Sequence, residues 1–216
     1  MSSVLRTHPL QGRPEISVSG QGFSFRKRFD GGYTIAHGSI INYEVVPDSL
    51  SLGLSFLSLA WKVRKELCLR LSSRFGMEWK EPKFWSPDEP SPFEKMRILS
   101  PSPVRKELEA AVINLVSAYP EFGGLQVAEE STGMIDVTPD AVPVISGVPN
   151  LLGLFFATGF SGHGFGIGPA AGELAANLVT AEQASVDYKP FDLSRFSDGC
   201  KICLVAGMID SLAHLR

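Results

Sequence analysis

Two stretches near the amino terminus alternate between apolar and polar residues, which is the pattern of half-buried β-strands. The sequence FSFRKR at residues 23–28 begins with phenylalanine at every second position, and residues 33–35 form a second arm. Asp30-Gly31-Gly32 lies between them, and tight hairpin turns favour glycine because it adopts positive φ without strain. The pattern predicts a β-hairpin over residues 23–38. Residues 1–14 show no such pattern, and we expect them to be irregular.

Apolar residues recur at helical spacing in two later stretches. Leucine and tryptophan line one face from Leu50 to Trp61, and a basic stretch with further leucines follows. This pattern predicts two helices or one bent helix over residues 49–80. Six prolines between residues 81 and 103 exclude a long helix there. Leucine, valine and tyrosine at residues 108, 112, 115 and 119 predict another helix that ends at Pro120. We interpret the tryptophans at 61, 79 and 85 as core or packing residues.

The carboxyl-terminal half begins with two stretches that alternate as strands do, residues 124–130 and residues 134–137. Thr138-Pro139-Asp140 then predicts a turn that the Asp140 side chain itself stabilises. A short apolar run at residues 142–145 and a second turn at residues 147–150 follow. Residues 151–157 (LLGLFFA) are long enough for a buried strand and too short to cross a membrane.

A glycine-rich loop follows this strand and leads into a predicted helix. The glycines at residues 162, 164, 166 and 168 alternate with His163, Phe165 and Ile167, so a locally extended backbone would leave one edge without side chains. Pro169 suits the first position of a helix. Strand, loop and helix together present backbone N–H groups and a positive helix end to an anion or an electron-rich ring.

The loop fits neither of two common nucleotide-binding motifs. G-x-G-x-x-G fails in both registers, because Ile167 and Pro169 occupy the positions of the final glycine. No Gly-Lys-Ser/Thr follows, which excludes a P-loop. A glycine run alone is as consistent with a tightly turned structural loop as with a binding site.

Three segments carry a specific resemblance: TPDAVPVI at residues 138–145, LFFATGFSGHGF at residues 154–165 and GPAAGEL at residues 168–174. They resemble the C-terminal part of the FAD-dependent oxidoreductases of the D-amino acid oxidase, glycine oxidase and sarcosine oxidase family. The predicted hairpin is similar to that family's substrate-domain sheet, and the resemblance runs from Ile16 to Phe196. It implies FAD as cofactor and oxidation of a carbon–nitrogen bond next to a carboxylate.

The resemblance also implies that the loop passes the flavin ring and that the helix behind it points its N-terminus at the pyrimidine end. Such a helix end carries about half a positive charge, which stabilises the negative charge that reduction leaves on the ring. His163 is expected beside the ring or hydrogen-bonded to backbone, and no catalytic residue is identified. Cofactor contacts are expected from Gly159, Ser161, Gly162, His163, Gly164, Phe165, Gly166, Ile167 and Gly168.

Candidates for binding a substrate carboxylate lie on the predicted hairpin. Arg26 and Arg28 follow one arm, and either guanidinium suits a bidentate carboxylate clamp. A solvated strand face explains these two arginines equally well. Tyr33 and His37 lie on the second arm, where they face either the substrate or the sheet.

Composition and charge narrow the function classes. The 216 residues are 44% hydrophobic and 20% charged, which predicts a folded core. A net charge of -3 gives no reason to expect nucleic acid or an anionic membrane surface as a partner. We find no secretory signal and no apolar run long enough to span a membrane. Three cysteines are too few for a disulfide framework, and Cys200-x-x-Cys203 has no partner pair for a metal site. A reducing, cytoplasmic setting is therefore expected.

Together these features predict an α+β fold, a truncated member of an α/β family. We expect a substrate-domain portion with an antiparallel sheet and helices at residues 15–130. The C-terminal strand, loop and helix of an FAD-binding domain are expected at residues 131–198, and an irregular tail at residues 199–216. The G-x-G-x-x-G motif that binds the ADP half of FAD in this family is missing, so the chain is expected to be the C-terminal portion of a longer enzyme.

The expected function is oxidation of an amino acid of the D-amino acid, glycine or N-methylglycine type, by hydride transfer to FAD. Oxygen or a carrier would accept the electrons. Two alternatives stay open. In the first, the chain is a non-catalytic remnant or a subunit that needs a second chain with the nucleotide-binding half. In the second, the chain binds small carboxylates without a redox role.

Overall fold

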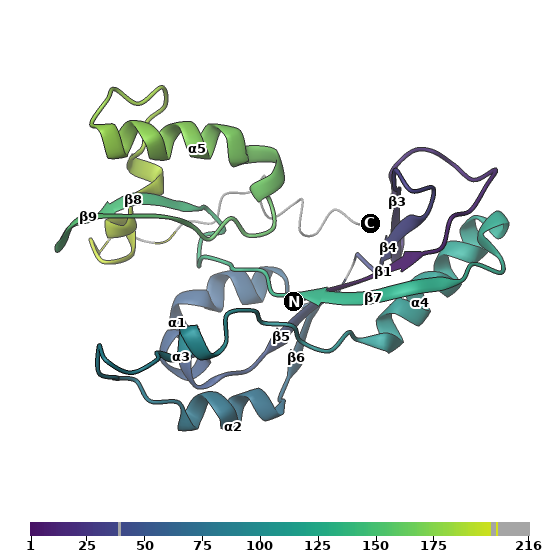
Figure 1. Ribbon diagram of the computed structural model, residues 1–216, viewed down its shortest axis with the longest axis horizontal. Coiled ribbons are helices and arrows are strands. Elements are labelled where there is room, and N and C mark those ends of the chain that lie inside the picture. Colours follow the sequence, from purple (N-terminus) through teal and green to yellow (C-terminus); the bar gives the residue numbers. More distant parts are fainter. Residues whose placement is uncertain (39, 200–201, 203–216) are drawn as a thin grey trace. The chain divides into compact units, whose positions relative to one another are not determined.

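The computed structural model describes residues 1–38, 40–199 and 202 (Figure 1). This part of the chain divides into two compact units: unit 1 comprises residues 1–53 and 63–134, and unit 2 comprises residues 54–62 and the chain from residue 135. Both units combine helices with antiparallel strand pairs, which confirms the expected α+β class. Most of the expected tail and both cysteines of Cys200-x-x-Cys203 lie outside the described residues.

Unit 1 is built on a five-stranded antiparallel sheet with strand order β2-β3-β4-β1-β7. A second, two-stranded sheet pairs β5 with β6 in parallel. The strands of unit 1 are β1 (Ser2–Thr7), β2 (Val18–Gly20), β3 (Phe23–Lys27), β4 (Tyr33–Ala36), β5 (Ile41–Glu44), β6 (Leu67–Arg70) and β7 (Val127–Gly133). Its helices are α2 (Ser73–Lys80), α3 (Pro92–Lys95), α4 (Arg105–Ala118) and the 3₁₀ turn η1 (Pro120–Phe122), while α1 (Pro47–Lys62) begins in unit 1.

The predicted hairpin is confirmed as β3 and β4, which pair in antiparallel register with Phe25 opposite Ile35. In the turn, Gly31 has a φ of +83°, which only glycine adopts without strain. The Asp30 carboxylate accepts a hydrogen bond of 3.0 Å from the Gly32 amide. The turn residues therefore stabilise the hairpin in the way that the sequence indicates.

The expectation of an irregular amino terminus is wrong, because β1 lies inside the sheet between β4 and β7. Leu5 is buried in the core. The other two inward-facing residues of β1, Ser3 and Thr7, are polar, so the sequence shows no apolar–polar alternation there. These polar groups have partners: the Thr7 hydroxyl accepts from the Tyr33 amide at 2.9 Å, and the Ser3 hydroxyl accepts from the Val104 amide at 3.1 Å.

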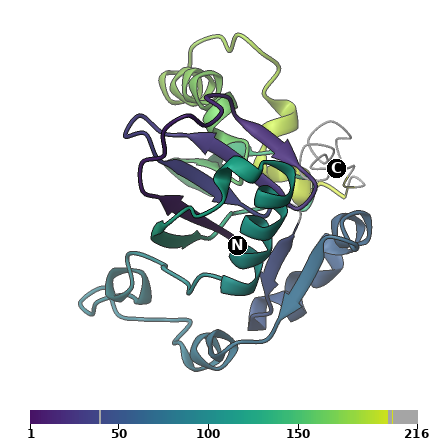
Figure 2. The same cartoon turned by 90° about the vertical axis from the view of Figure 1, so that its right-hand side faces the viewer.

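Helix α4 covers one face of the five-stranded sheet (Figure 2). The helix predicted before Pro120 is thus confirmed. Leu108 and Leu115 of its predicted face are buried, Val112 and Tyr119 are partly buried, and the buried Ala111 was not predicted. The Tyr33 ring packs edge-on against the Phe122 ring with centroids 5.0 Å apart, and the Tyr33 hydroxyl donates to the Pro14 carbonyl. The core comprises Leu5, Phe23, Phe25, Tyr33, Ile35, Leu108, Ala111, Leu115 and Phe122.

Of the two alternatives predicted for residues 49–80, the structure has two helices, α1 and α2, rather than one bent helix. The strand β6 between them was not predicted. Leu67, Leu69 and Leu71 stand at every second position, which is strand periodicity rather than helix periodicity. The proline-rich stretch holds no long helix, as expected, and contains only the four-residue α3. Across residues 47–103, only Leu59 and Val63 are buried.

Unit 2 contains the antiparallel pair β8 (Val144–Val148) and β9 (Leu151–Thr158), helix α5 (Gly164–Thr180) and the 3₁₀ turns η2 (Lys189–Phe191) and η3 (Leu193–Phe196). Helix α5 lies along the strand pair (Figure 1) and packs Ala171 and Leu174 against Ile145. Strand β9 is confirmed, but its expected burial is wrong, since all its residues are exposed. The strand expected at residues 134–137 is also wrong, because β7 ends at Gly133.

We predict that Leu5→Ala lowers the free energy of unfolding by about 2–5 kcal/mol, because it leaves a cavity in the core of unit 1. Ile113→Ala, on the exposed side of α4, is the control and changes it by less than about 0.5 kcal/mol. Urea unfolding followed by circular dichroism measures both. If Leu5→Ala and Ile113→Ala lowered the free energy of unfolding equally, Leu5 of β1 would not contribute to the core.

Candidate functional site

The loop between β9 and α5 turns through left-handed backbone conformations. Gly159 has a φ of +73°, Ser161 of +51° and Gly162 of +85°. Glycine adopts such values freely, whereas a serine there is strained by about 1–3 kcal/mol. Ser161 is fully buried, and its hydroxyl donates to the Gly159 carbonyl at 3.1 Å. The surrounding contacts must therefore hold Ser161 in place.

Asp136 supplies most of those contacts. Its carboxylate oxygen Oδ2 accepts from the Gly159 amide at 2.5 Å and from the Thr158 hydroxyl at 3.0 Å. Its backbone carbonyl accepts from the Ser161 amide at 3.1 Å. An isolated bridge between Val137 and Phe160 continues this pairing. Asp136 thus fixes both ends of the strained turn, although the sequence did not single it out.

Gly159 is required for its space as well as its conformation. A Cβ atom placed on Gly159 would lie 2.4 Å from Cγ2 of Thr138. Thr138 cannot easily withdraw, because it is buried and its hydroxyl donates to the Val142 carbonyl at 2.8 Å. The turn at residues 138–140 and the glycine loop therefore pack directly on one another.

Helix α5 begins at Gly164, so the prediction that Pro169 opens it is wrong. The His163 carbonyl accepts from the amides of Gly166 (3.1 Å) and Ile167 (3.3 Å), which starts the helix five residues earlier. Pro169 lies inside the helix and leaves the Phe165 carbonyl without its usual amide donor. The expectation of an extended strip of alternate glycines is wrong for the same reason, since Gly164, Gly166 and Gly168 are helical.

The start of α5 is open and uncapped. No side chain caps this end of the helix, and the amides of Gly164 and Phe165 have no partner among the described residues. Cβ atoms placed on Gly166 and Gly168 would meet nothing within 4 Å. Phe165 and Ile167 extend from the same turns, and the Phe165 side chain is exposed. A flat, electron-rich group fits against such a surface, because backbone donors can approach it closely.

An ion pair between Arg195 and Asp140 connects η3 to the turn at residues 138–140. Nε of Arg195 donates to Oδ2 of Asp140 at 2.7 Å, and its Nη2 donates to the Val142 carbonyl at 2.7 Å. Oδ1 of Asp140 also accepts from the Val142 amide at 3.0 Å, as predicted for a turn-stabilising aspartate. Burial opposes ionisation of Asp140, but the Arg195 and Val142 hydrogen bonds outweigh it and lower the pKa of the carboxyl group.

The four substrate candidates do not lie together. Arg26 is exposed on the sheet face opposite α4, where the register aligns it with Thr34 and Arg6 across neighbouring strands. Tyr33 lies in the core, and the strand alternation puts His37 on the same side as α4. Arg28 forms an ion pair with Asp30 in the hairpin turn. Of the four candidates, only Arg26 therefore presents a guanidinium to the open sheet face.

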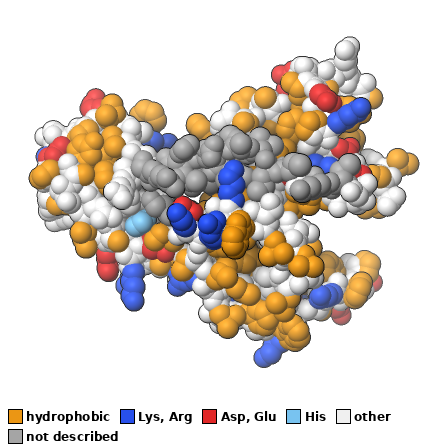
Figure 3. Space-filling model, turned by 180° about the vertical axis from the view of Figure 1, so that it is seen from behind, with side chains coloured by type: hydrophobic (Ala, Val, Ile, Leu, Met, Phe, Trp, Pro, Cys, Tyr) orange, Lys and Arg blue, Asp and Glu red, His pale blue; other side chains and the backbone are white. Residues whose placement is uncertain are grey.

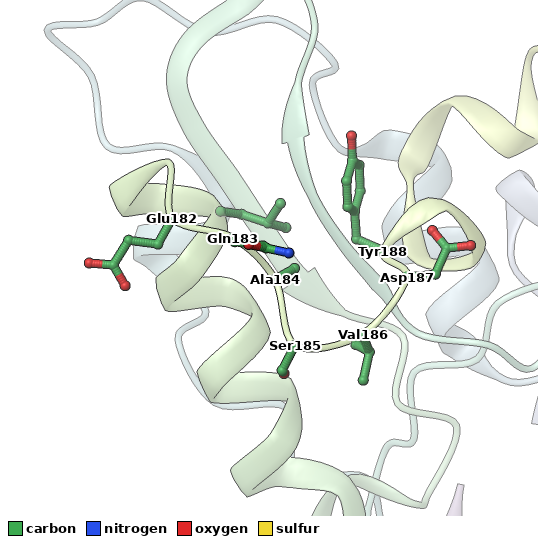
Figure 4. Close-up of a pocket in the computed structure, with 8 residues that line it drawn as sticks. Glu182, Gln183, Ala184, Ser185, Val186, Asp187 and Tyr188 are labelled. Atoms are coloured by element: carbon green, nitrogen blue, oxygen red, sulfur yellow. The ribbon is translucent and has the colours of Figure 1, made fainter.

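A cavity of about 510 Å³ in unit 2 lies beside the C-terminal end of α5 and is lined by Leu178 and residues 182–188 (Figure 4). None of its lining residues belongs to the glycine loop. Its lining includes Glu182, Asp187 and Tyr188 but no lysine, arginine or histidine, so it offers no cation to a phosphate or carboxylate. No cluster of His, Cys, Asp or Glu in the described chain suits a metal ion.

Among the described residues, none of the helices is long and apolar enough to cross a bilayer.

The sequence profile of the family described as "FAD dependent oxidoreductase" matches residues 2–178. The chain belongs to this family. The resemblance seen in the sequence is therefore confirmed, and the family's cofactor is FAD. The glycine loop and the start of α5 fall within the matched residues.

Known relatives are similar over part of their length. N-methyl-L-tryptophan oxidase of Salmonella dublin is 37% identical over 83 residues, 38% of this chain and 22% of that protein. The structure of L-amino acid deaminase from Proteus vulgaris matches with a TM-score of 0.83 at 28% identity, covering 90% of this chain and 45% of that one. L-amino acid deaminase from Proteus myxofaciens, solved in complex with anthranilate, gives 0.84 at 32% identity, covering 90% and 43%. The chain spans less than half the length of these relatives.

We predict that Asp140→Asn lowers the free energy of unfolding at pH 7 by about 3 kcal/mol, because it leaves Arg195, whose side chain is only 14% exposed, without its anion. The folded-state pKa of Asp140 lies below its unfolded value. Its contribution is therefore complete above the unfolded pKa of about 3.9 and is lost as the pH falls through the folded pKa.

The difference between the wild type and Asp140→Asn should accordingly shrink in acid, which urea unfolding between pH 7 and pH 2 measures. Asp88→Asn, at an exposed position, serves as the control and should show little difference at any pH. A gap for Asp140→Asn that stays constant down to the lowest pH would contradict the ion-pair assignment.

Proposed function

We propose that the protein binds FAD at the start of α5 and takes part in oxidising the carbon–nitrogen bond of an amino acid in the cytoplasm. The observation that carries the proposal is the uncapped helix start, where the Gly164 and Phe165 amides are free among the described residues and no side chain shields Gly166 or Gly168. The membership of a FAD-dependent family supports flavin as the ligand.

In this proposal, the residues of the glycine loop and of the first turns of α5 hold the flavin ring. The backbone amides and the positive helix end would stabilise negative charge on a reduced ring bound there. Their stabilisation of that charge is about 1–2 kcal/mol in a partly buried site. When bound, the flavin supplies the two-electron acceptor for a hydride from the α-carbon of the substrate. Asp136 holds the glycine loop in the conformation that would let the Gly164 and Phe165 amides approach the flavin.

Arg26 is the candidate that binds the substrate carboxylate. Its guanidinium is exposed and forms no ion pair with the described residues, whereas the neighbouring Arg6 pairs with Glu129 at 3.1 Å. A bidentate guanidinium–carboxylate contact fixes the orientation of an amino acid. The names of the relatives, N-methyl-L-tryptophan oxidase and L-amino acid deaminase, support an amino acid or N-methylated amino acid as substrate. Oxygen or a carrier would accept the electrons.

A second candidate is a subunit that works only beside another chain, or a remnant without activity. The absence of G-x-G-x-x-G from the sequence favours it, because that motif binds the pyrophosphate of dinucleotides. Gel filtration after incubation with FAD separates the two candidates. Retained flavin absorption that amino acids bleach without oxygen supports a self-sufficient enzyme. A colourless protein supports the second candidate.

We predict that Gly166→Ala weakens FAD binding at least tenfold while leaving the fold intact, because its Cβ would occupy the open space that the ring needs. In the chain alone this Cβ meets nothing within 4 Å, and alanine favours the helix by up to about 1 kcal/mol over glycine.

Gly172→Ala, further along α5 and equally unobstructed, is the matched control and should bind FAD as the wild type does. Quenching of flavin fluorescence gives the affinities, and thermal unfolding gives the stabilities. If Gly166→Ala bound FAD with unchanged affinity, the flavin ring would not bind at this helix start.

We predict that Arg26→Ala raises KM for the amino acid about 10- to 100-fold, since a charge-assisted hydrogen bond contributes about 1.5–3 kcal/mol. Arg28→Ala is the control, because the Arg28 guanidinium is already bound to Asp30 in the turn. Its KM should change less than threefold. Steady-state kinetics of the flavin-loaded protein measure both, and a larger effect for Arg28 would reverse the assignment.

A further inference from the structure

Strand β9 has a free edge without the protection that such edges usually carry. It is the longest strand of the described chain, with eight residues (LLGLFFAT) and no charge or proline. It pairs with β8 on one side, in regular register from Phe155 to Thr158, and with no described strand on the other. Natural proteins protect free edges with charged residues, prolines or very short strands. Edge strand β7 carries Glu129 and Glu130, whereas β9 leaves an uncharged edge open.

The side chains of β9 are apolar on both faces. Ile145 of β8 packs against α5, and the register puts Ala157 beside it. Strand alternation therefore places Leu154 and Phe156 on the outer face, away from α5, where they are 39% and 40% exposed. A continuous apolar run is typical of a strand that is covered on both faces. The outer face of β9 is nevertheless partly open, since η3 packs mainly against β8.

Other exposed apolar side chains lack this combination of features. Figure 3 shows hydrophobic side chains at many places on the surface. The expectation that the tryptophans are core residues is wrong, because Trp61, Trp79 and Trp85 are 71%, 66% and 42% exposed. None of the three lies on a strand. Strand β9 differs from them because it offers unpaired backbone donors and acceptors together with apolar side chains.

The relatives indicate what is missing beside β9. This chain covers 45% of L-amino acid deaminase from Proteus vulgaris and contains no G-x-G-x-x-G. In dinucleotide-binding units that motif follows the first strand of a parallel sheet with helices on both faces, an environment that suits an apolar strand. Given FAD binding at the start of α5 as proposed above, we propose that the free edge and outer face of β9 bind the first strand of a nucleotide-binding unit that this chain does not contain.

The position of the glycine loop sets the direction of the added strand. Ligands of open α/β sheets bind beyond the carboxyl ends of the strands, and the carboxyl end of β9 leads to Gly159 and the start of α5. A parallel strand would bring its own glycine-rich turn to the same sheet edge, where both turns can contact one dinucleotide. An antiparallel strand would place that turn at the far end of the eight residues of β9, roughly 25 Å away.

A second copy of the chain fits β9 less well. Two copies paired through β9 about a two-fold axis perpendicular to the sheet would run antiparallel, so their glycine loops would lie at opposite ends of the pair. Both α5 helices would cover the same face of the joined sheet. Leu154 and Phe156 of both copies would therefore stay exposed on the other face.

Co-purification tests the proposal without FAD. The full chain is co-expressed with a tagged portion of the Proteus vulgaris L-amino acid deaminase, the part outside the matched 45%, and we expect a complex. Phe156→Lys should weaken the complex at least about tenfold, because it places an unpaired charge in an apolar contact. Ile113→Lys, on the exposed side of α4, is the matched control and should bind as the wild type does.

Hydrogen exchange gives a second measure that does not require the tagged portion to fold separately. Joining that portion to Met1 in one chain should slow exchange of the free-edge amides of β9 at least about tenfold relative to this chain alone, because they gain partners. Unchanged exchange overturns the proposal, as does equal weakening of the complex by Phe156→Lys and Ile113→Lys.

Gel filtration of this chain alone covers the alternative occupant. A dimer that Phe156→Lys disrupts, with no slowing of exchange in the joined chain, assigns β9 to a second copy and also overturns the proposal. None of these measurements uses FAD, so a negative result is distinguishable from failure of the FAD site, which Gly166→Ala tests.

Discussion

The turn from β9 into α5 depends on three left-handed positions within four residues, Gly159, Ser161 and Gly162, being held in place. Gly159 and Gly162 adopt them freely, but Ser161 is buried and strained. Asp136 compensates by accepting hydrogen bonds from both ends of the turn. Because this turn sets where the helix begins, it also sets which backbone amides remain available. The properties of the candidate site therefore follow from one short stretch of backbone and from the aspartate beside it.

Sequence patterns predicted an element correctly where the residues that determine it lie within one short segment. The β3–β4 hairpin and helix α4 were predicted because alternation, a glycine turn and helical spacing are all contained within a few residues. Strand β1 was not, since its inward positions are Ser3 and Thr7 as well as Leu5. Those hydroxyls bind backbone amides of distant segments. A polar residue with a distant partner cannot be distinguished from a solvated one in the sequence alone.

At the candidate site, too, local features could be predicted from the sequence and long-range contacts could not. Its glycines were recognised, but the conformation of the loop was not, because alternate glycines are compatible with both a strand and a helix start. Arg195 could not be predicted, since its partner Asp140 lies 55 residues away and nothing local marks it. Asp136 left one weak signal, an acidic residue between Ile135 and Val137.

The separation between Asp140 and Arg195 has a consequence for synthesis on the ribosome. Chains emerge amino terminus first, so the turn at residues 138–140, the strand pair and α5 are all made before Arg195. Until then Asp140 has its amide donor from Val142 but no cation, and burying it would leave a carboxylate uncompensated. The nascent unit must keep this turn hydrated or its carboxyl protonated. The Asp140–Arg195 ion pair is thus a late contact, formed only once η3 has been made.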